Sequence, residues 1–110
     1  MTIRLCCLLW ARPGAAGALA AYEDKVLALL GEHDGRILQR ARADGAEGRP
    51  DEIQLIEFAS QAGYDGFMAD ERRTSLAGDR DAAIARTELY PVELVETTVS
   101  PGAVRDDGIG

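Results

Sequence analysis

The 110-residue sequence has few histidines and cysteines, and little positive charge. His33 is its one histidine, and its two cysteines, Cys6 and Cys7, form no Cys-x-x-Cys pair, which argues against a zinc site within one chain. Neighbouring strand residues point to opposite faces, so the cysteines also form no disulfide with each other. A net charge of −7 lacks the clustered Lys and Arg that phosphates need, and therefore argues against nucleic acid and an anionic membrane as partners.

Long apolar runs are also missing. The run from Ile3 to Trp10 is interrupted by Arg4, is followed by Pro13-Gly14, and is too short to cross a membrane. It lacks a signal-peptide layout, so we expect a cytoplasmic protein with reduced thiols. The sequence has no catalytic Ser-His-Asp order, phosphate-binding glycine loop or metal-ligand spacing, and we predict no cofactor.

Apolar residues make up 46% of the sequence, which is enough to form the hydrophobic core of one domain. We assign that domain to residues 1–96 and expect residues 97–110, which show no periodicity, to be a disordered tail. Runs of apolar residues, alternation and turn signals predict strands at 3–10, 36–42, 52–58 and 87–95, a helix over 14–33, and helical segments from Ser60 with a break near Asp70.

The helix over 14–33 has an apolar stripe at three- and four-residue steps, formed by Leu19, Tyr22, Val26, Leu30 and His33. We place Glu23, Asp24 and Lys25 on or toward the other side. Gly31 and Gly35 mark the exit, because glycine readily adopts the left-handed conformation. In the following strand, alternation assigns Ile37, Gln39 and Ala41 to one face, and Leu38, Arg40 and Arg42 to the other.

The order strand, helix, strand, strand, helix, strand predicts an α+β, ferredoxin-like βαββαβ fold with a four-stranded antiparallel sheet. In this topology the first and third strands are central, and here they are the most apolar. The second and fourth strands lie at the edges, which suits Pro91, because proline donates no ladder hydrogen bond.

Helices cover only one face of such a sheet. Alternate residues of the first strand are apolar on both sides, so a monomer would expose a large apolar patch. We therefore predict a homodimer in which two sheets face each other.

Three segments resemble the dimeric α/β-barrel superfamily over residues 3–96: Leu8-Leu9-Trp10-Ala11-Arg12-Pro13-Gly14, Tyr22-Glu23, and Ile56-Glu57-Phe58-Ala59-Ser60. The closest likeness is to an uncharacterised branch whose third strand ends Glu-Phe-Pro-Ser, with Ala59 here in place of proline. More distant likenesses are to EthD-like proteins and cofactor-free quinol monooxygenases, and the superfamily also holds muconolactone isomerases, haem-degrading enzymes and chlorite dismutases.

The resemblance to the monooxygenases implies a pocket between sheet and helices, with Asn and Trp beside an aromatic substrate. The present sequence contains no asparagine, which departs from that pattern. For haem handling it offers one ligand, His33, without a supporting motif.

Two residues are candidates for acid–base work. His33 titrates near neutrality and lies on the apolar stripe, where it is either a base or a helix-end residue that interacts with the helix dipole. Glu57 interrupts an apolar strand, and either is desolvated with a raised pKa or lies at the rim, paired with Arg40 or Arg86.

Aromatic and basic side chains supply candidate ligand contacts. Trp10, Tyr22, Tyr64 and Phe67 either shape a pocket for a flat molecule or pack in the core or dimer. Arg40, with Arg42, either binds a carboxylate or phosphate or protects an edge strand from aggregation. These features favour a dimer that binds a small apolar or aromatic molecule, with proton-transfer or monooxygenase-like chemistry if it is an enzyme. The alternative is a non-catalytic binding or regulatory module.

Overall fold

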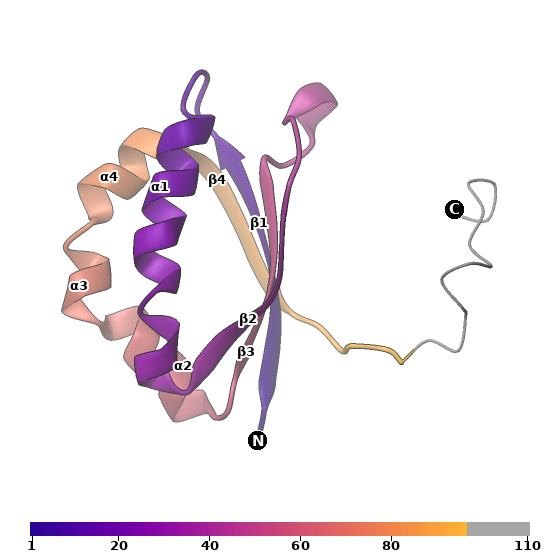
Figure 1. The fold of residues 1–110 in the computed structure, drawn as a ribbon, viewed down its shortest axis with the longest axis vertical. Helices are drawn as coiled ribbons and strands as arrows, with labels where there is room; N and C mark the ends of the chain where they lie inside the picture. The colour runs from indigo at the N-terminus through magenta and orange to yellow at the C-terminus, as the bar shows by residue number, and fades with distance from the viewer. Residues whose placement is uncertain (97–110) are drawn as a thin grey trace.

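The computed structural model describes residues 1–96. Helices lie on one side of a four-stranded sheet, and the other side is uncovered (Figure 1). The elements are, in chain order, β1 (Ile3–Ala11), α1 (Ala16–Leu27), the 3-10 turn η1 (Leu30–His33), β2 (Gly35–Arg42), the 3-10 turn η2 (Ala46–Gly48), β3 (Glu52–Phe58), α2 (Gln61–Ala69), α3 (Glu71–Thr74), α4 (Ala77–Ala83) and β4 (Ile84–Pro91).

The sheet has the order β2-β3-β1-β4 with every neighbouring pair antiparallel. The predicted α+β, ferredoxin-like fold is thereby confirmed, with the two most apolar strands in the centre. Pro91 pairs with Leu5 and is the last residue of the edge strand β4, where a missing N–H does not interrupt the sheet.

The helix-facing side of the sheet holds the core. Leu5, Cys7 and Leu9 of β1 are buried there, as are Ile56 and Phe58 of β3. They pack against the apolar stripe of α1, in which Leu19, Tyr22 and Val26 are buried. One prediction for this helix was wrong: Glu23 is not on the outer side but is 6% exposed, because α1 turns it toward the sheet.

The exit of α1 also differs from the prediction. The helix ends at Leu27, η1 follows, and the left-handed residue is Asp34 (φ 56°) rather than Gly31 or Gly35. Gly35 serves another purpose, because a Cβ there would lie 2.8 Å from a ring carbon of Phe58. It allows close packing at the start of β2.

The second helical region begins and breaks where the sequence predicts. The Ser60 hydroxyl accepts a hydrogen bond from the Gly63 N–H and caps α2 (3.1 Å). Asp70 has extended backbone, which ends α2, and its carboxylate accepts the Arg72 N–H to cap α3 (2.9 Å). This double role makes α3 a separate short helix.

Two strand predictions were wrong in detail. A register shift between Ile37 and Gln39 places Ile37 opposite Ile56, on the helix side with Arg40, while Gln39 and Ala41 lie on the open side. Strict alternation fails there because a bulge adds one residue. The fourth strand is Ile84–Pro91 instead of 87–95, since buried Ile84 already pairs with Ala11. The predicted disordered tail lies outside the described residues.

The uncovered side, here called the open face, carries apolar side chains on its central strands. Ion pairs flank them at one end, where Arg4 and Arg36 each lie 2.9 Å from Glu57. The apolar members are half-buried or exposed: Cys6, Leu8, Ile53, Leu55 and Tyr90.

Candidate functional site

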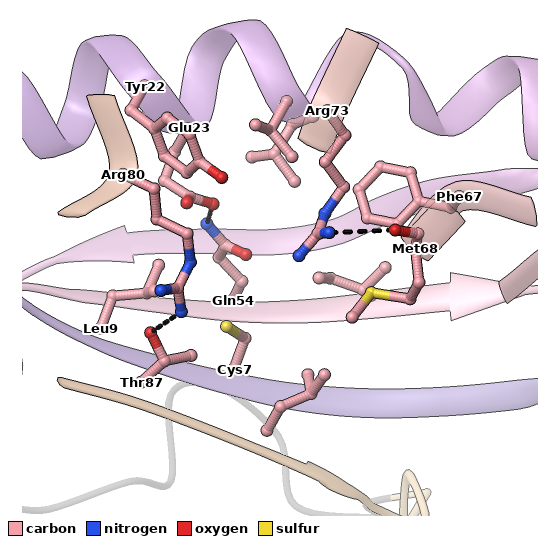
Figure 2. Close-up of a pocket in the computed structure, with 14 residues that line it drawn as sticks. Cys7, Leu9, Tyr22, Glu23, Gln54, Phe67, Met68, Arg73, Arg80 and Thr87 are labelled. Carbon is pink, nitrogen blue, oxygen red and sulfur yellow. Dashed lines mark hydrogen bonds between the residues drawn. The ribbon is translucent and has the colours of Figure 1, made fainter. Parts of the chain in front are cut away.

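A cavity of about 80 Å³ lies between the helices and the sheet (Figure 2). An ordered water needs roughly 10–15 Å³ of such volume, so the cavity has room for a molecule of several non-hydrogen atoms. Its walls combine apolar side chains with a few convergent polar ones, which is the composition of small-molecule sites. The polar side chains are Tyr22, Glu23, Gln54, Arg73, Arg80 and Thr87.

Glu23 is the acid of this cavity. The Gln54 amide nitrogen donates to its carboxylate (2.8 Å), and both side chains are buried. Burial raises the pKa of Glu23 above its ordinary value, and the Gln54 hydrogen bond only partly opposes this. A carboxyl group with a raised pKa accepts a proton more readily than an exposed one, so Glu23 is suited to proton transfer.

Gln54 is held from behind by a second buried acid, Glu52. The same amide nitrogen donates to Glu52 (2.6 Å), and the Glu52 carboxylate is 2.7 Å from Arg40 and 3.7 Å from Arg42. With both hydrogens of its amide directed at carboxylates, Gln54 has a fixed orientation. The predicted ligand contact Arg40 therefore lies at the outer end of this chain, where it also pairs with Asp24 (2.6 Å).

Two guanidinium groups enter the cavity from the short helices α3 and α4. Arg73 of α3 donates from Nη1 to the Met68 carbonyl (3.1 Å) and lies 5.6 Å from the Phe67 ring centre. Arg80 of α4 donates to the Thr87 hydroxyl (2.9 Å). The two hydrogen bonds are drawn as dashed lines in Figure 2, which shows both groups reaching the space beside Gln54.

Two further groups at the cavity stay neutral. Burial raises the pKa of the Cys7 thiol to about 12, so it is not a thiolate nucleophile at neutral pH. Burial likewise raises the pKa of Tyr22, whose hydroxyl keeps its proton and can donate a hydrogen bond. Within residues 1–96 no group of three or more His, Cys, Asp and Glu side chains is placed to hold a metal ion.

Of the predicted site residues, the structure brings Tyr22 and Phe67 together at the cavity. Trp10 lies near the C-terminal end of β1, on the open face. There its ring nitrogen donates to the Gly48 carbonyl (2.9 Å) and Arg86 stacks over its ring. Tyr64 packs edge-on against Phe58 and lines a separate, open hollow of about 260 Å³ that has no charged side chain in its wall.

The two predicted acid–base residues lie away from the cavity. His33 is bonded through Nε2 to Asp70 (2.8 Å), and joins η1 to the α2–α3 junction. Glu57 is on the open face, where hydrogen bonds from Arg36 and Arg4 hold its pKa below its ordinary value. Of the two environments considered for Glu57, the structure shows the paired one, with different arginines from those named.

Sequence reasoning missed Glu23, Gln54, Arg73 and Arg80. A signal was present for the first two. Glu23 follows Leu19 by four residues and precedes Val26 by three, so it lies on the apolar stripe of the helix. Gln54 alternates with Ile56 and Phe58 and shares their face of the strand. For the arginines no local signal exists, because α3 and α4 are too short to show a periodicity.

No protein-family model and no curated protein matches the sequence. Solved structures show a likeness in fold. A protein of unknown function from Rhodopseudomonas palustris is 18% identical with a TM-score of 0.71, over 87% of this chain and 84% of that one. SnoaB, a cofactor-independent oxygenase from Streptomyces nogalater, is 9% identical with a TM-score of 0.66, over 90% and 98% of the two chains.

A third neighbour is a dimeric protein of unknown function with a ferredoxin-like fold from Bacteroides fragilis, 8% identical with a TM-score of 0.65, over 84% and 96% of the chains. At these identities the likeness establishes the ferredoxin-like fold. It agrees with the fold-level resemblance found in the sequence, while the branch with the Glu-Phe-Pro-Ser strand end stays a prediction. None of the helices in residues 1–96 is long and apolar enough to cross a membrane.

Proposed function

We propose that the protein binds a small, largely apolar or aromatic molecule in the cavity between helices and sheet, and that Glu23 takes a proton from it. The observation that carries this proposal is the placement of Glu23. It is a buried carboxyl group with a raised pKa, held by Gln54 at the wall of a cavity that also admits two guanidinium groups. Titratable groups with pKa values shifted by burial in a cavity are typical of functional sites.

In its enzymatic form the reaction is a cofactor-independent oxidation. Removal of a proton from a phenolic or enolisable aromatic compound leaves an electron-rich anion that reacts with O2 directly. In a balanced oxygenation, a CH2 group and O2 give a carbonyl group and one water molecule, so no external reductant is required. The fold-level likeness to SnoaB, a cofactor-independent oxygenase, supports this chemistry.

The alternative is a non-catalytic binding or regulatory module that functions as a dimer. The open face favours it, because Cys6, Leu8 and Leu55 form an apolar surface that a second copy of the same sheet would cover. The Bacteroides fragilis neighbour is described as dimeric, which also supports a homodimer. The free thiols of Cys6 and Cys7 fit a reducing compartment, and we propose the cytoplasm as the location.

A ligand screen tests the binding. Thermal unfolding of the protein is followed with quinols, anthrones, lactones, fatty acids and haem at about 100 times their dissociation constants, where a ligand stabilises the folded state by about 2.7 kcal/mol. We expect aromatic hydroxyl compounds to raise the Tm. If no class of compound does so, the cavity is not a ligand site and the dimeric module is favoured.

A pair of variants tests the chemistry on whichever compound binds. We expect Glu23→Gln to retain binding and to slow O2 consumption by roughly a hundredfold or more, because it removes the proton acceptor. Glu57→Gln is the matched control, since Glu57 lies on the open face, and its rate should equal that of the unsubstituted protein. Binding without O2 consumption or proton release in the unsubstituted protein would contradict the enzymatic form.

A further inference from the structure

The charge pairing of the arginines separates three of them from the others. Most described guanidinium groups have a carboxylate partner, for example Arg4 and Arg36 with Glu57, Arg40 with Glu52, and Arg72 with Asp70 and Glu32. Among residues 1–96, Arg12, Arg73 and Arg80 form no ion pair, although the chain has 19 acidic and 12 basic residues. Of these three, Arg73 and Arg80 line the cavity and Arg12 does not.

Arg73 also has an unused donor. Its Nη1 is bonded to the Met68 carbonyl, but its Nε is buried and has no hydrogen-bond partner in the described part of the chain. Buried donors of proteins are almost always paired, and arginine keeps its charge at every relevant pH. The Nε atom has almost no accessible surface, so a ligand would meet Arg73 at its terminal nitrogens. A guanidinium group without a carboxylate partner at a cavity wall leaves its charge to be balanced by a molecule that the cavity receives.

The cavity is polar at one end and apolar at the other. Figure 2 shows Arg80, Thr87 and Tyr22 toward one end, and Phe67 with Met68 toward the other, with Arg73 between them. A ligand that fits both ends has an apolar ring and one anionic group. Guanidinium groups form charge-assisted hydrogen bonds to oxygen anions, which are stronger than those to neutral acceptors.

We propose that the ligand is an aromatic oxygen acid, a phenol or enol, whose anion is held by Arg73 and Arg80. This inference rests on the proposed function and assigns the two guanidinium groups that hold its ionised substrate. The O–H proton moves to the Glu23 carboxylate, and the electron pair stays on the ligand oxygen. Negative charge thereby passes from Glu23, which burial disfavours as an anion, to a group beside two cations. Cys7 and Tyr22, the other titratable groups at the cavity, remain neutral throughout.

Two probes of almost the same shape test this, para-nitrophenol and para-nitroanisole. Only the first ionises, and its phenolate is yellow. We expect the unsubstituted protein to bind para-nitrophenol at least tenfold more tightly by calorimetry, and to turn it yellow at a pH where the free probe is mostly colourless. Equal affinities without a colour change would overturn the inference alone, because they would show that the guanidinium groups do not hold an anion. If neither probe binds, the inference fails together with the cavity as a ligand site.

Substitutions then assign the effect to the two guanidinium groups. Arg73→Met and Arg80→Met should each lose the tenfold preference for para-nitrophenol and keep the affinity for para-nitroanisole. Arg12→Met is the matched control, because exposed Arg12 contacts the Asp81 carbonyl and does not line the cavity. If Arg73→Met does not fold, Arg80→Met and the colour of the unsubstituted complex decide. A preference that persists in the folded variants overturns the assignment.

Discussion

The two faces of the sheet are built in opposite ways, and β3 shows the contrast most clearly. Glu52 and Gln54 point toward the helices and are each 1% exposed, whereas their neighbours Ile53 and Leu55 point to the open face. In a sheet that only stabilises a monomer, the polar residues would face water and the apolar ones the helices. Here the first half of the strand places its polar side chains inside, whereas Ile56 and Phe58 in its second half follow the usual order.

This inversion separates two tasks. The covered face holds the hydrogen-bonded chain from Arg40 through Glu52 and Gln54 to Glu23, which ends at the cavity. Every member must be paired there, because a buried polar group without a partner is costly. The open face carries no such chain, and its apolar centre suits association. The comparison teaches that the proposed ligand chemistry and the proposed assembly would use opposite sides of the same strands.

The largest effect is expected where the buried chain is broken. Glu52→Ala leaves Arg40 and the Gln54 amide without their common acceptor, and should lower the free energy of unfolding by about 3 kcal/mol. Urea unfolding at one fixed protein concentration measures this. Glu57→Ala, on the open face, is the control, and its effect should be much smaller because water reaches Arg4 and Arg36. Equal losses in the two variants would remove the distinction between the faces.

The next effect concerns assembly. Leu55→Arg puts a charge in the centre of the open face and should raise the dissociation constant of the proposed dimer about a hundredfold, or about 2.8 kcal/mol. Sedimentation velocity over a dilution series measures the change. Ile37→Arg substitutes an exposed isoleucine on the helix side of β2, and should leave the dimer intact. A monomeric unsubstituted protein, or a dimer unaffected by Leu55→Arg, contradicts the role given to this face.

The smallest effect is the pH dependence contributed by Glu23. Its pKa is raised in the folded state, so the folded protein binds more protons than the unfolded chain above the ordinary pKa of 4.5. This contribution to stability is fully present below pH 4.5 and is lost as the pH rises. The stability of Glu23→Gln relative to the unsubstituted protein should therefore increase with pH. Chemical unfolding between pH 4 and 8 measures the difference, and a constant difference would be evidence against a desolvated Glu23.

The sequence allowed the topology to be predicted because each strand has a distinct local pattern. The apolar run at Ile3 and the alternation ending at Phe58 mark the central strands, and Pro91 marks an edge. The strand predictions were wrong where a single residue shifts the alternation of side chains or the start of a strand. The bulge at Leu38 exchanges the faces of β2, and the start of β4 follows directly from α4 at Ile84 without a turn signal.

The candidate site was predictable only in its aromatic part. Tyr22 and Phe67 follow the apolar period of their helices and so reach the cavity. Glu23 shares that stripe but was assigned to the solvent because charged residues usually are exposed. Arg72 and Arg73 are adjacent and point in opposite directions, the first to Glu32 and the second into the cavity. Asp70 bonds to the Arg72 guanidinium and also contacts His33, which is far away in the chain, so no local pattern shows this arrangement.

The position of Arg73 and Arg80 on short helices has a consequence for how the cavity can change during evolution. The proton acceptor and its amide support belong to α1 and β3, which are anchored in the core, whereas Arg73 and Arg80 belong to short helices joined by an arch between Ala69 and Ala83. Changes in the length or residues of this arch would reshape the ligand end of the cavity and leave both the acid and the open face in place. One scaffold could thus receive different ligands while its buried acid and its open face are inherited unchanged.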